Sequence, residues 1–301
     1  MLSCVTARVL LAVSLLLSAC SVFGAALEQI ISREQKEMAG TGAQLGVGRD
    51  GHVFVIKPGF LLRFNPDGSG KVGHRVSYAA MNATANANGI LAVSASHMDA
   101  TVWMYSPGLE ELARAREFMG SDLMGWFSPS DVQVGPSGDF YAPDPHRRRA
   151  VRIAPTGKTV AEFSLKATGE EYKHTPLRLR VAEPLQRLYV ASASGVLMAL
   201  GFDGKKIWAI TPGIQGHPYS WKDYEGDFDV DDAGNVYVLK VMTDVVEVFD
   251  KDGKPSGKIQ LEMGDRRGRQ LSLRVTAERP GSRTRTARAA NGKPTNCPWA
   301  T

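Results

Sequence analysis

Short apolar runs and glycine turns alternate along most of this chain. The clearest stretch is DVQVGPSGDFYAPDPHRRRAVRIAPTGKTVAEFSL, residues 131–165. It predicts four short antiparallel strands, because β-branched and aromatic residues fill runs that Gly, Pro and Asp interrupt. A single sheet of this kind cannot bury both of its faces, so the unit needs neighbours built in the same way.

Two turn signals recur in register along the chain. The first precedes an apolar triplet such as Phe140, Tyr141 and Ala142, and the second has the form APTG or DKDG. Pro and Asp favour such reversals, and Gly accepts the positive φ that they require. The first turn falls at Gly51, Gly89, Gly138, Gln186 and Gly234, and the second ends at Gly68, Gly108, Gly157, Gly204 and Gly253. Five copies are therefore predicted, at about 42–75, 80–118, 129–165, 177–210 and 226–263.

Four-stranded units of this period are typical of the blades of a β-propeller. The copies GDFYAPDPHRRRAVRIAPTG and GNVYVLKVMTDVVEVFDKDG resemble NHL repeats and the related six-bladed family, while RLYVASASGVLMALGFDGKKIWAI resembles a pyrroloquinoline-quinone-type repeat. The resemblance covers residues 40–263. It implies an all-β propeller of the six-bladed type with five recognisable four-stranded blades and a degenerate or missing last blade. It leaves the function open, because such folds host enzymes and binding modules alike.

The composition changes abruptly near Gly264. Residues 264–301 hold nine Lys and Arg against Asp265 and Glu278, which gives 9 − 2 = +7, and only QLSLRV at 270–275 has the pattern of a strand. We therefore expect a basic, disordered tail, as a frame-shifted end or a functional extension. Blades one and five would then face each other across a gap, or across a filler from residues 27–38 and 270–275. An exposed edge at Val245, Val246 and Val248 would follow.

The excess of positive charge lies at the two ends of the chain. The formal net charge is +5, the tail contributes +7 and Arg8 +1, so residues 21–263 carry 5 − 7 − 1 = −3. This body has no basic field for a nucleic-acid partner.

The amino terminus has the pattern of an export signal. Arg8 precedes the apolar run VLLAVSLLLSA, which is too short to span a bilayer. The run ends in Leu-Ser-Ala-Cys20, which resembles the lipobox of bacterial lipoproteins and implies lipidation of Cys20. We therefore expect a signal peptide at 1–19, a tether at 20–39, and anchoring to the bacterial cell envelope, with an outer-membrane destination open. The alternative is an ordinary signal peptide cut after Ala25 or Ala26.

The cysteines are consistent with an exported, lipid-anchored protein. Cys4 would leave with the signal and Cys20 would carry lipid, so Cys297 remains the one thiol. An intrachain disulfide is then impossible, and stability has to come from packing of the core.

Candidate ligand-binding residues gather in the loops that open on one face of a propeller. They are Asp99, Asp144, Arg147, Tyr219, Trp221 and Asp244. Aromatic rings beside carboxylates suit a protein or carbohydrate ligand, through stacking and directional hydrogen bonds. For Asp144 the structural alternative is favoured, in which its carboxylate caps the turn into the third strand by accepting backbone N–H groups.

A metal site is a more specific hypothesis for these loops than general ligand binding. His97, His146 and His217 come from three blades, and three imidazoles with an open position would bind a divalent metal such as zinc. No HxH or HxxxH spacing fixes any pair, so scattered surface histidines are the favoured interpretation. There is no GxSxG, Walker or GxGxxG motif either. We therefore expect a lipid-anchored extracytoplasmic binding or scaffold module without a cofactor. The alternative is a metal-dependent lyase or lactone hydrolase.

Overall fold

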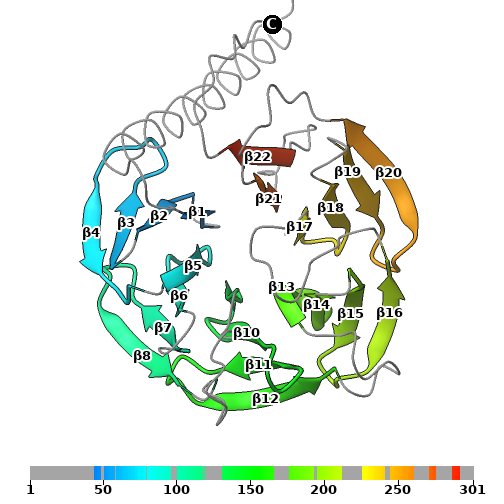
Figure 1. The fold of residues 1–301 in the computed structure, drawn as a ribbon, viewed down its shortest axis with the longest axis horizontal. Helices are drawn as coiled ribbons and strands as arrows, with labels where there is room; N and C mark the ends of the chain where they lie inside the picture. The colour runs from blue at the N-terminus through cyan, green and yellow to red at the C-terminus, as the bar shows by residue number, and fades with distance from the viewer. Residues whose placement is uncertain are drawn as a thin grey trace, which may run out of the picture.

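The computed structural model is a ring of antiparallel β-sheets around a centre (Figure 1). It describes residues 44–48, 51–57, 59–78, 80–95, 100–116, 118, 131–165, 176–192, 195–211, 226–240, 245–260, 271–275 and 287–291. Within these residues, no helix reaches the length and apolarity needed to cross a bilayer. The all-β prediction is confirmed.

Five sheets have four strands each, hydrogen-bonded in chain order, and we number them as blades 1 to 5. Blade 1 contains β1 (Gln44–Val47), β2 (Val53–Lys57), β3 (Phe60–Phe64) and β4 (Val72–Arg75); blade 2 contains β5 (Ala80–Ala85), β6 (Leu91–Ala95), β7 (Val102–Tyr105) and β8 (Glu111–Ala115). Blade 3 contains β9 (Gln133–Val134), β10 (Phe140–Asp144), β11 (Arg149–Ile153) and β12 (Thr159–Ser164). Blade 4 contains β13 (Pro176–Ala182), the 3-10 turn η3 (Glu183–Leu185), β14 (Arg187–Ser192), β15 (Leu197–Gly201) and β16 (Lys206–Ile210); blade 5 contains β17 (Gly226–Val230), β18 (Val236–Lys240), β19 (Val245–Phe249) and β20 (Pro255–Gln260).

The first strand of each blade is innermost and the fourth is outermost (Figure 1). Because neighbouring strands are antiparallel, both predicted turns of a blade lie at one end of the ring, which we call the turn end. The connection from the second strand to the third, and the link to the next blade, leave from the opposite end, which we call the loop end.

The predicted turns are confirmed, with one shift of register. Gly51, Gly89, Gly138 and Gly234 all have positive φ, and Gln186 takes the same region at φ 50°. In blade 2, however, it is Leu109, and not Gly108, that has φ 66° and donates its N–H to the carbonyl oxygen of Ser106 at 2.9 Å. A left-handed Leu is strained, but its side chain is buried in the cluster between blades 1 and 2, and that burial offsets the strain.

The core is a series of apolar layers between neighbouring blades. Alternate residues of each strand face opposite neighbours, so that in β17 Phe228 and Val230 pack toward blade 4. In blade 4, Tyr189 and Ala191 face them, while Leu188 and Val190 pack toward blade 3. Each blade is thus apolar on both faces, which explains why single copies of the repeat showed continuous apolar runs.

Side chains also join the blades at the turn end. Asn86 Nδ2 donates to the Gly135 carbonyl at 3.1 Å, and Tyr189 Oη donates to the Gly234 carbonyl at 3.3 Å. The remaining bonds run from Arg63 to the Pro107 carbonyl, from Tyr141 Oη and Ser137 to the Glu183 carboxylate, and from Trp208 Nε1 and Arg187 to the Lys251 carbonyl. Every neighbouring pair among the five blades is therefore joined at this end.

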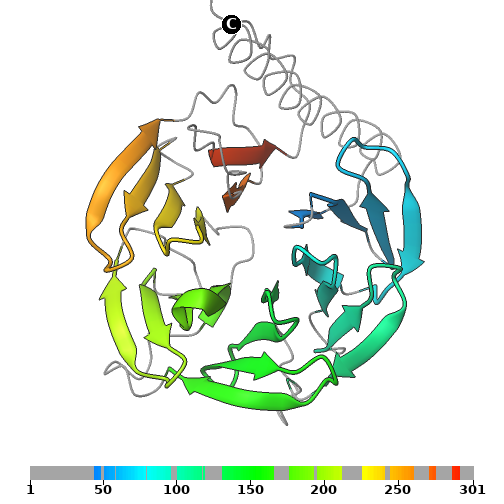
Figure 2. The same ribbon diagram turned by 180° about the vertical axis from the view of Figure 1, so that it is seen from behind.

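The sixth position of the ring holds two strands (Figure 2). β21 (Leu271–Val275) pairs with β22 (Ala287–Asn291), and β21 lies against β17. The strand expected at 270–275 is confirmed and fills the interval between blades 5 and 1, whereas β22 was not predicted. The other proposed filler, residues 27–38, lies outside the described residues.

The prediction of an exposed valine edge is wrong. β19 pairs with β18 on one side and with β20 on the other, so it is not an edge strand. Val246 is fully buried, and the blade 5 face that points away from blade 4 also buries Leu239. Blade 1 buries Val53 and Phe64 on its corresponding face. The apolar faces on both sides of the sixth position are thus covered.

Two glycines of the second turn provide a matched test of packing between blades. Gly204 and Gly253 have φ of 78° and 77°, but an added Cβ meets nothing within 4 Å at Gly204 and lies 2.8 Å from the Trp208 ring at Gly253. Gly204→Ala should cost about 1 kcal/mol of unfolding free energy from backbone strain alone. Gly253→Ala should cost roughly 1–3 kcal/mol more, because the rigid indole has to move. Urea unfolding of both variants measures the difference, and equal losses would show that Trp208 does not hold blades 4 and 5 together.

Candidate functional site

The inner strands carry a buried network of charged side chains centred on Arg180. Its Nη1 donates to Asp131 Oδ2 at 2.8 Å, its Nε to Asp229 Oδ1 at 3.0 Å and its Nη2 to Asp227 Oδ1 at 3.4 Å. Nη1 also donates to the carbonyl of Leu179 at 2.6 Å. One guanidinium on blade 4 therefore bridges carboxylates from blade 3 and blade 5.

The network follows from the repeat itself. Arg180 is separated by 49 residues from Asp131 and by 49 from Asp229, and Asn82, which donates to Asp131, precedes it by 49. Blades 2 to 5 thus each contribute a polar residue at the same position of the repeat, in or just before the inner strand. Adjacent residues in these strands, such as Val132 and Phe228, point the other way into the apolar layers.

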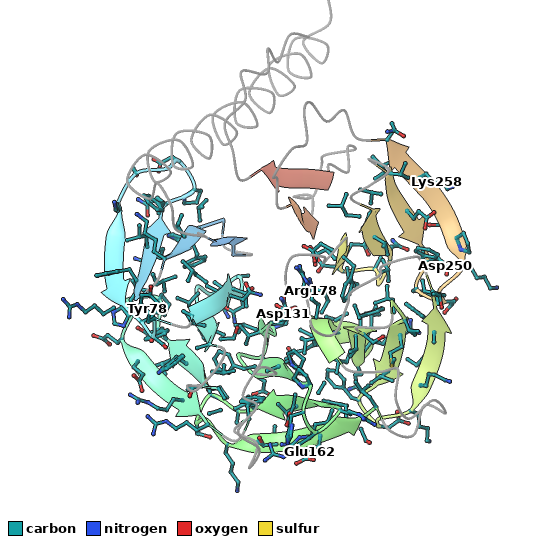
Figure 3. All side chains as sticks on the ribbon, viewed as in Figure 1. Tyr78, Asp131, Glu162, Arg178, Asp250 and Lys258 are labelled. Carbon is teal, nitrogen blue, oxygen red and sulfur yellow. The ribbon has the colours of Figure 1, made fainter. Side chains whose placement is uncertain are left out.

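A second arginine extends the network toward solvent. Arg178 Nη1 donates to Asp227 Oδ1 at 2.7 Å, and its side chain is 27% exposed whereas that of Arg180 is 4% exposed. Figure 3 shows Arg178 and Asp131 at the centre of the ring. Because Asp227 is the second residue of its strand, the network lies toward the loop end of the inner strands.

Backbone groups fix the carboxylates in place. Asp131 accepts the N–H of Val132 at 2.9 Å and that of Leu179 at 3.0 Å, and Asp227 accepts the N–H of Phe228 at 2.9 Å. The Arg180 guanidinium also lies 5.3 Å from the centre of the Phe228 ring. Such preorganised acceptors reduce the cost of burying the ions, because every charge has partners.

Arg180 remains a cation in this position. Burial acts to lower its pKa, but the three carboxylates of Asp131, Asp227 and Asp229 more than offset burial and raise the pKa above its ordinary value. The guanidinium therefore cannot serve as a proton donor or acceptor. Its ion pairs join blades 3, 4 and 5, and it shares the acceptor Asp227 with Arg178.

Asp144 is the described member of the predicted ligand-binding set whose surroundings are clearest. Its carboxylate is 1% exposed, accepts the N–H of Arg147 at 3.1 Å, and pairs with Arg147 Nη1 at 3.2 Å and Arg149 Nε at 2.9 Å. These contacts match the capping role considered for it. Arg147 itself has a 40% exposed side chain at the loop end and stays a ligand-binding candidate.

Of the three histidines in the metal hypothesis, the structure describes one. His146 is exposed in the connection between β10 and β11. Among the part of the chain that the structure describes, no group of three His, Cys, Asp or Glu side chains is placed to hold a metal. His97, His217, Asp99, Tyr219, Trp221, Asp244 and Cys20 lie outside the described residues. Their roles therefore stay predictions.

Sequence reasoning missed the Arg180 network. A signal was present, because Asn82, Asp131, Arg180 and Asp229 recur at intervals of 49 residues, close to the spacing of the repeat. The first turns are 49, 48 and 48 residues apart, so aligning the copies on those turns leaves these four residues one or two positions out of register. Only the closing of the ring brings these positions into contact.

The comparisons with known proteins concern the fold. No protein-family model matches the chain, and no curated protein is significantly similar in sequence. A protein of unknown function from Bacteroides caccae superposes with a TM-score of 0.54 at 12% identity, over 73% of this chain and 82% of its own. Virginiamycin B lyase from Staphylococcus aureus gives 0.55 at 13% identity over 77% and 74%, and Sqt1 from Saccharomyces cerevisiae gives 0.52 at 14% over 76% and 64%. At these identities the likeness establishes the β-propeller fold and no ligand or reaction.

Removing Arg180 should destabilise the fold strongly. Arg180→Met removes the cation that three buried carboxylates share, although Asp227 keeps its pair with Arg178, and this should cost about 3–5 kcal/mol of unfolding free energy. The control is Arg114→Met, which breaks the exposed pair with Glu111 and should change stability by about 0.5 kcal/mol or less. Chemical denaturation of both variants checks this, and similar midpoints would mean that the buried network contributes no more than a surface ion pair.

Proposed function

We propose that this protein is a lipid-anchored extracytoplasmic binding or scaffold module that takes a protein or carbohydrate partner at the loop end of its propeller. The observation that carries the proposal is the unlike construction of the two ends of the ring. At the turn end, short turns are bonded from blade to blade, as between Tyr189 and Gly234. At the loop end, the inner strands carry the ion pairs of Asp131, Arg178 and Asp227, and the links between blades begin and end there.

This construction suits recognition. At the turn end, hydrogen bonds join each neighbouring pair among the five blades and hold the strands rigidly. Loops that leave from the other end of these strands therefore lose less conformational entropy when they bind a partner. Binding residues in propellers and other scaffolds lie on loops for this reason. The links 116–132 and 211–225 are the longest, and the second contains Tyr219 and Trp221, the aromatic candidates.

The anchor is a separate part of the proposal and rests on the sequence. Cys20 follows an apolar run, and its lipid would join the propeller to the membrane through the tether at residues 20–39. Lipidation of this kind attaches a folded domain to a bilayer without any segment that spans it.

Cys20→Ser should release the protein from membranes or stall its processing, because no lipid can then be attached. Fractionation of cells with wild-type and variant chains, together with the mass of the mature protein, measures this. The neighbouring substitution Ser21→Ala is the control and should leave anchoring intact. Unchanged membrane fractionation and unchanged mass for Cys20→Ser would contradict the anchor.

Tyr219→Ala and Trp221→Ala should weaken binding to the partner roughly tenfold or more, as the loss of aromatic anchors does at other binding sites. Probes are an array of neutral and acidic oligosaccharides and, for protein partners, a photo-crosslinking residue placed at position 221 in intact membranes. Lys205→Ala, an 86% exposed residue at the turn end, is the control. Equal signals from the loop variants and the control would count against the loop end. A metal held at one equivalent per chain would favour the metal-dependent enzyme instead.

A further inference from the structure

An aromatic and basic patch lies at the loop end of blade 1. Tyr78 is 79% exposed and Phe60 is 45% exposed, although most large apolar side chains of this blade are buried. Phe60 is the first residue of β3 and pairs with Arg75, the last residue of β4, whose guanidinium lies 6.0 Å from the Phe60 ring centre. Lys57, at the end of β2, pairs with Phe60 on the other side.

Strand pairing holds three of these residues side by side, because Lys57 and Arg75 both pair with Phe60. The N–H of Val76 donates to the carbonyl of Gly59 at 3.1 Å, which ties the end of β4 to the start of β3. Tyr78 follows two residues later, and Figure 3 shows it at the outer rim of the ring. Lys57, Phe60, Arg75 and Tyr78 are thus the rim patch of blade 1.

The charge of the blades is distributed unevenly. Residues 44–78 hold five Lys and Arg against two Asp, 5 − 2 = +3, whereas residues 226–260 hold four Lys against eight Asp and Glu, 4 − 8 = −4. Blade 4 also holds more cationic than anionic residues, but two of its cations, Arg178 and Arg180, pair with buried carboxylates at the centre of the ring. Blade 1 therefore combines positive charge with exposed aromatic rings at its outer rim.

We propose that the rim patch of blade 1 docks on the anionic lipid surface to which the chain is tethered, so that blade 1 is the part of the propeller that contacts the bilayer. The proposal rests on the lipid anchor of the proposed function, because blade 1 is the first blade after the tether and its inner strand begins with Gln44 at the loop end. Tyr and Phe rings enter the headgroup region, and Lys and Arg are attracted to anionic lipids.

The tether makes a weak patch sufficient. Attachment through Cys20 keeps the propeller within reach of the bilayer, which raises the effective concentration of the patch at the surface. Blade 4 lies across the ring from blade 1 (Figure 1). Docking through the rim of blade 1 therefore leaves Arg147 of blade 3 on a part of the ring that does not contact the membrane.

The test uses the full chain with Cys20→Ser, so that no attached lipid contributes, and vesicles of phosphatidylcholine with or without phosphatidylglycerol. In co-sedimentation, Phe60→Ser combined with Tyr78→Ser should bind phosphatidylglycerol vesicles about tenfold more weakly than the parent. Arg75→Glu should weaken binding roughly fivefold for each unit of charge changed. The matched controls are Leu112→Ser with Val160→Ser, on the outer strands of blades 2 and 3, and Lys158→Glu at the turn end.

Thermal melts of every variant verify that each one is folded, which is expected because the changed side chains are exposed. Patch variants that bind as well as their controls would overturn the proposal. So would equal binding to vesicles with and without phosphatidylglycerol, or no binding by the parent chain. Because the parent carries no lipid, the outcome is independent of whether Cys20 anchors the protein, which cell fractionation decides.

Discussion

Each sheet in this protein is apolar on both faces, and the whole architecture depends on burying those faces. In a stack of such sheets the two end faces would stay exposed to water, whereas in a ring every face finds a neighbour. The sixth position shows how strong this requirement is. Val53 and Phe64 on one side and Leu239 and Val246 on the other are buried as deeply as side chains between complete blades.

Ring closure also explains the charged centre. The inner strands lie close together near the centre of the ring. Along each strand, one set of alternate residues is apolar and packs between blades, while the other set is polar and meets its counterparts from neighbouring blades. A lone carboxylate there would be costly, and Asp131, Asp227 and Asp229 are acceptable because Arg180 reaches all of them. The inner strands of blades 3, 4 and 5 are thus held together by ion pairs.

The sequence predicted the parts of the fold that depend on local rules. Blade limits, strand order and nearly all turns follow from period-two patterning and from Gly at positive φ, and the strand at 270–275 was visible for the same reason. Leu109 was missed because tertiary burial overrides a local preference for Gly. β22 was missed because ARAAN has little strand propensity, and pairing with β21 decides its conformation.

The site was less predictable, for a physical reason. Capping of a turn by Asp144 involves neighbours within a few residues, so its pattern can be recognised in the sequence. Arg180 meets partners 49 residues away on either side, and nothing local distinguishes it from an exposed arginine. Candidates such as Trp221 belong to long links, where composition indicates chemistry but no short-range rule fixes position.

The bonds at the turn end affect how this sequence can diverge. Between blades 1 and 2, 2 and 3, and 4 and 5, the acceptor is a main-chain carbonyl, at Pro107, Gly135, Gly234 and Lys251. Every amino acid carries that group, so the bond itself does not depend on the side chain of the accepting residue. Space limits two of these positions, because an added Cβ would overlap Glu183 Oε1 at Gly135 and would lie 2.6 Å from Leu185 Cδ1 at Gly234. Divergence of a duplicated blade is therefore limited by space at the accepting turn and by chemistry at the donating residue.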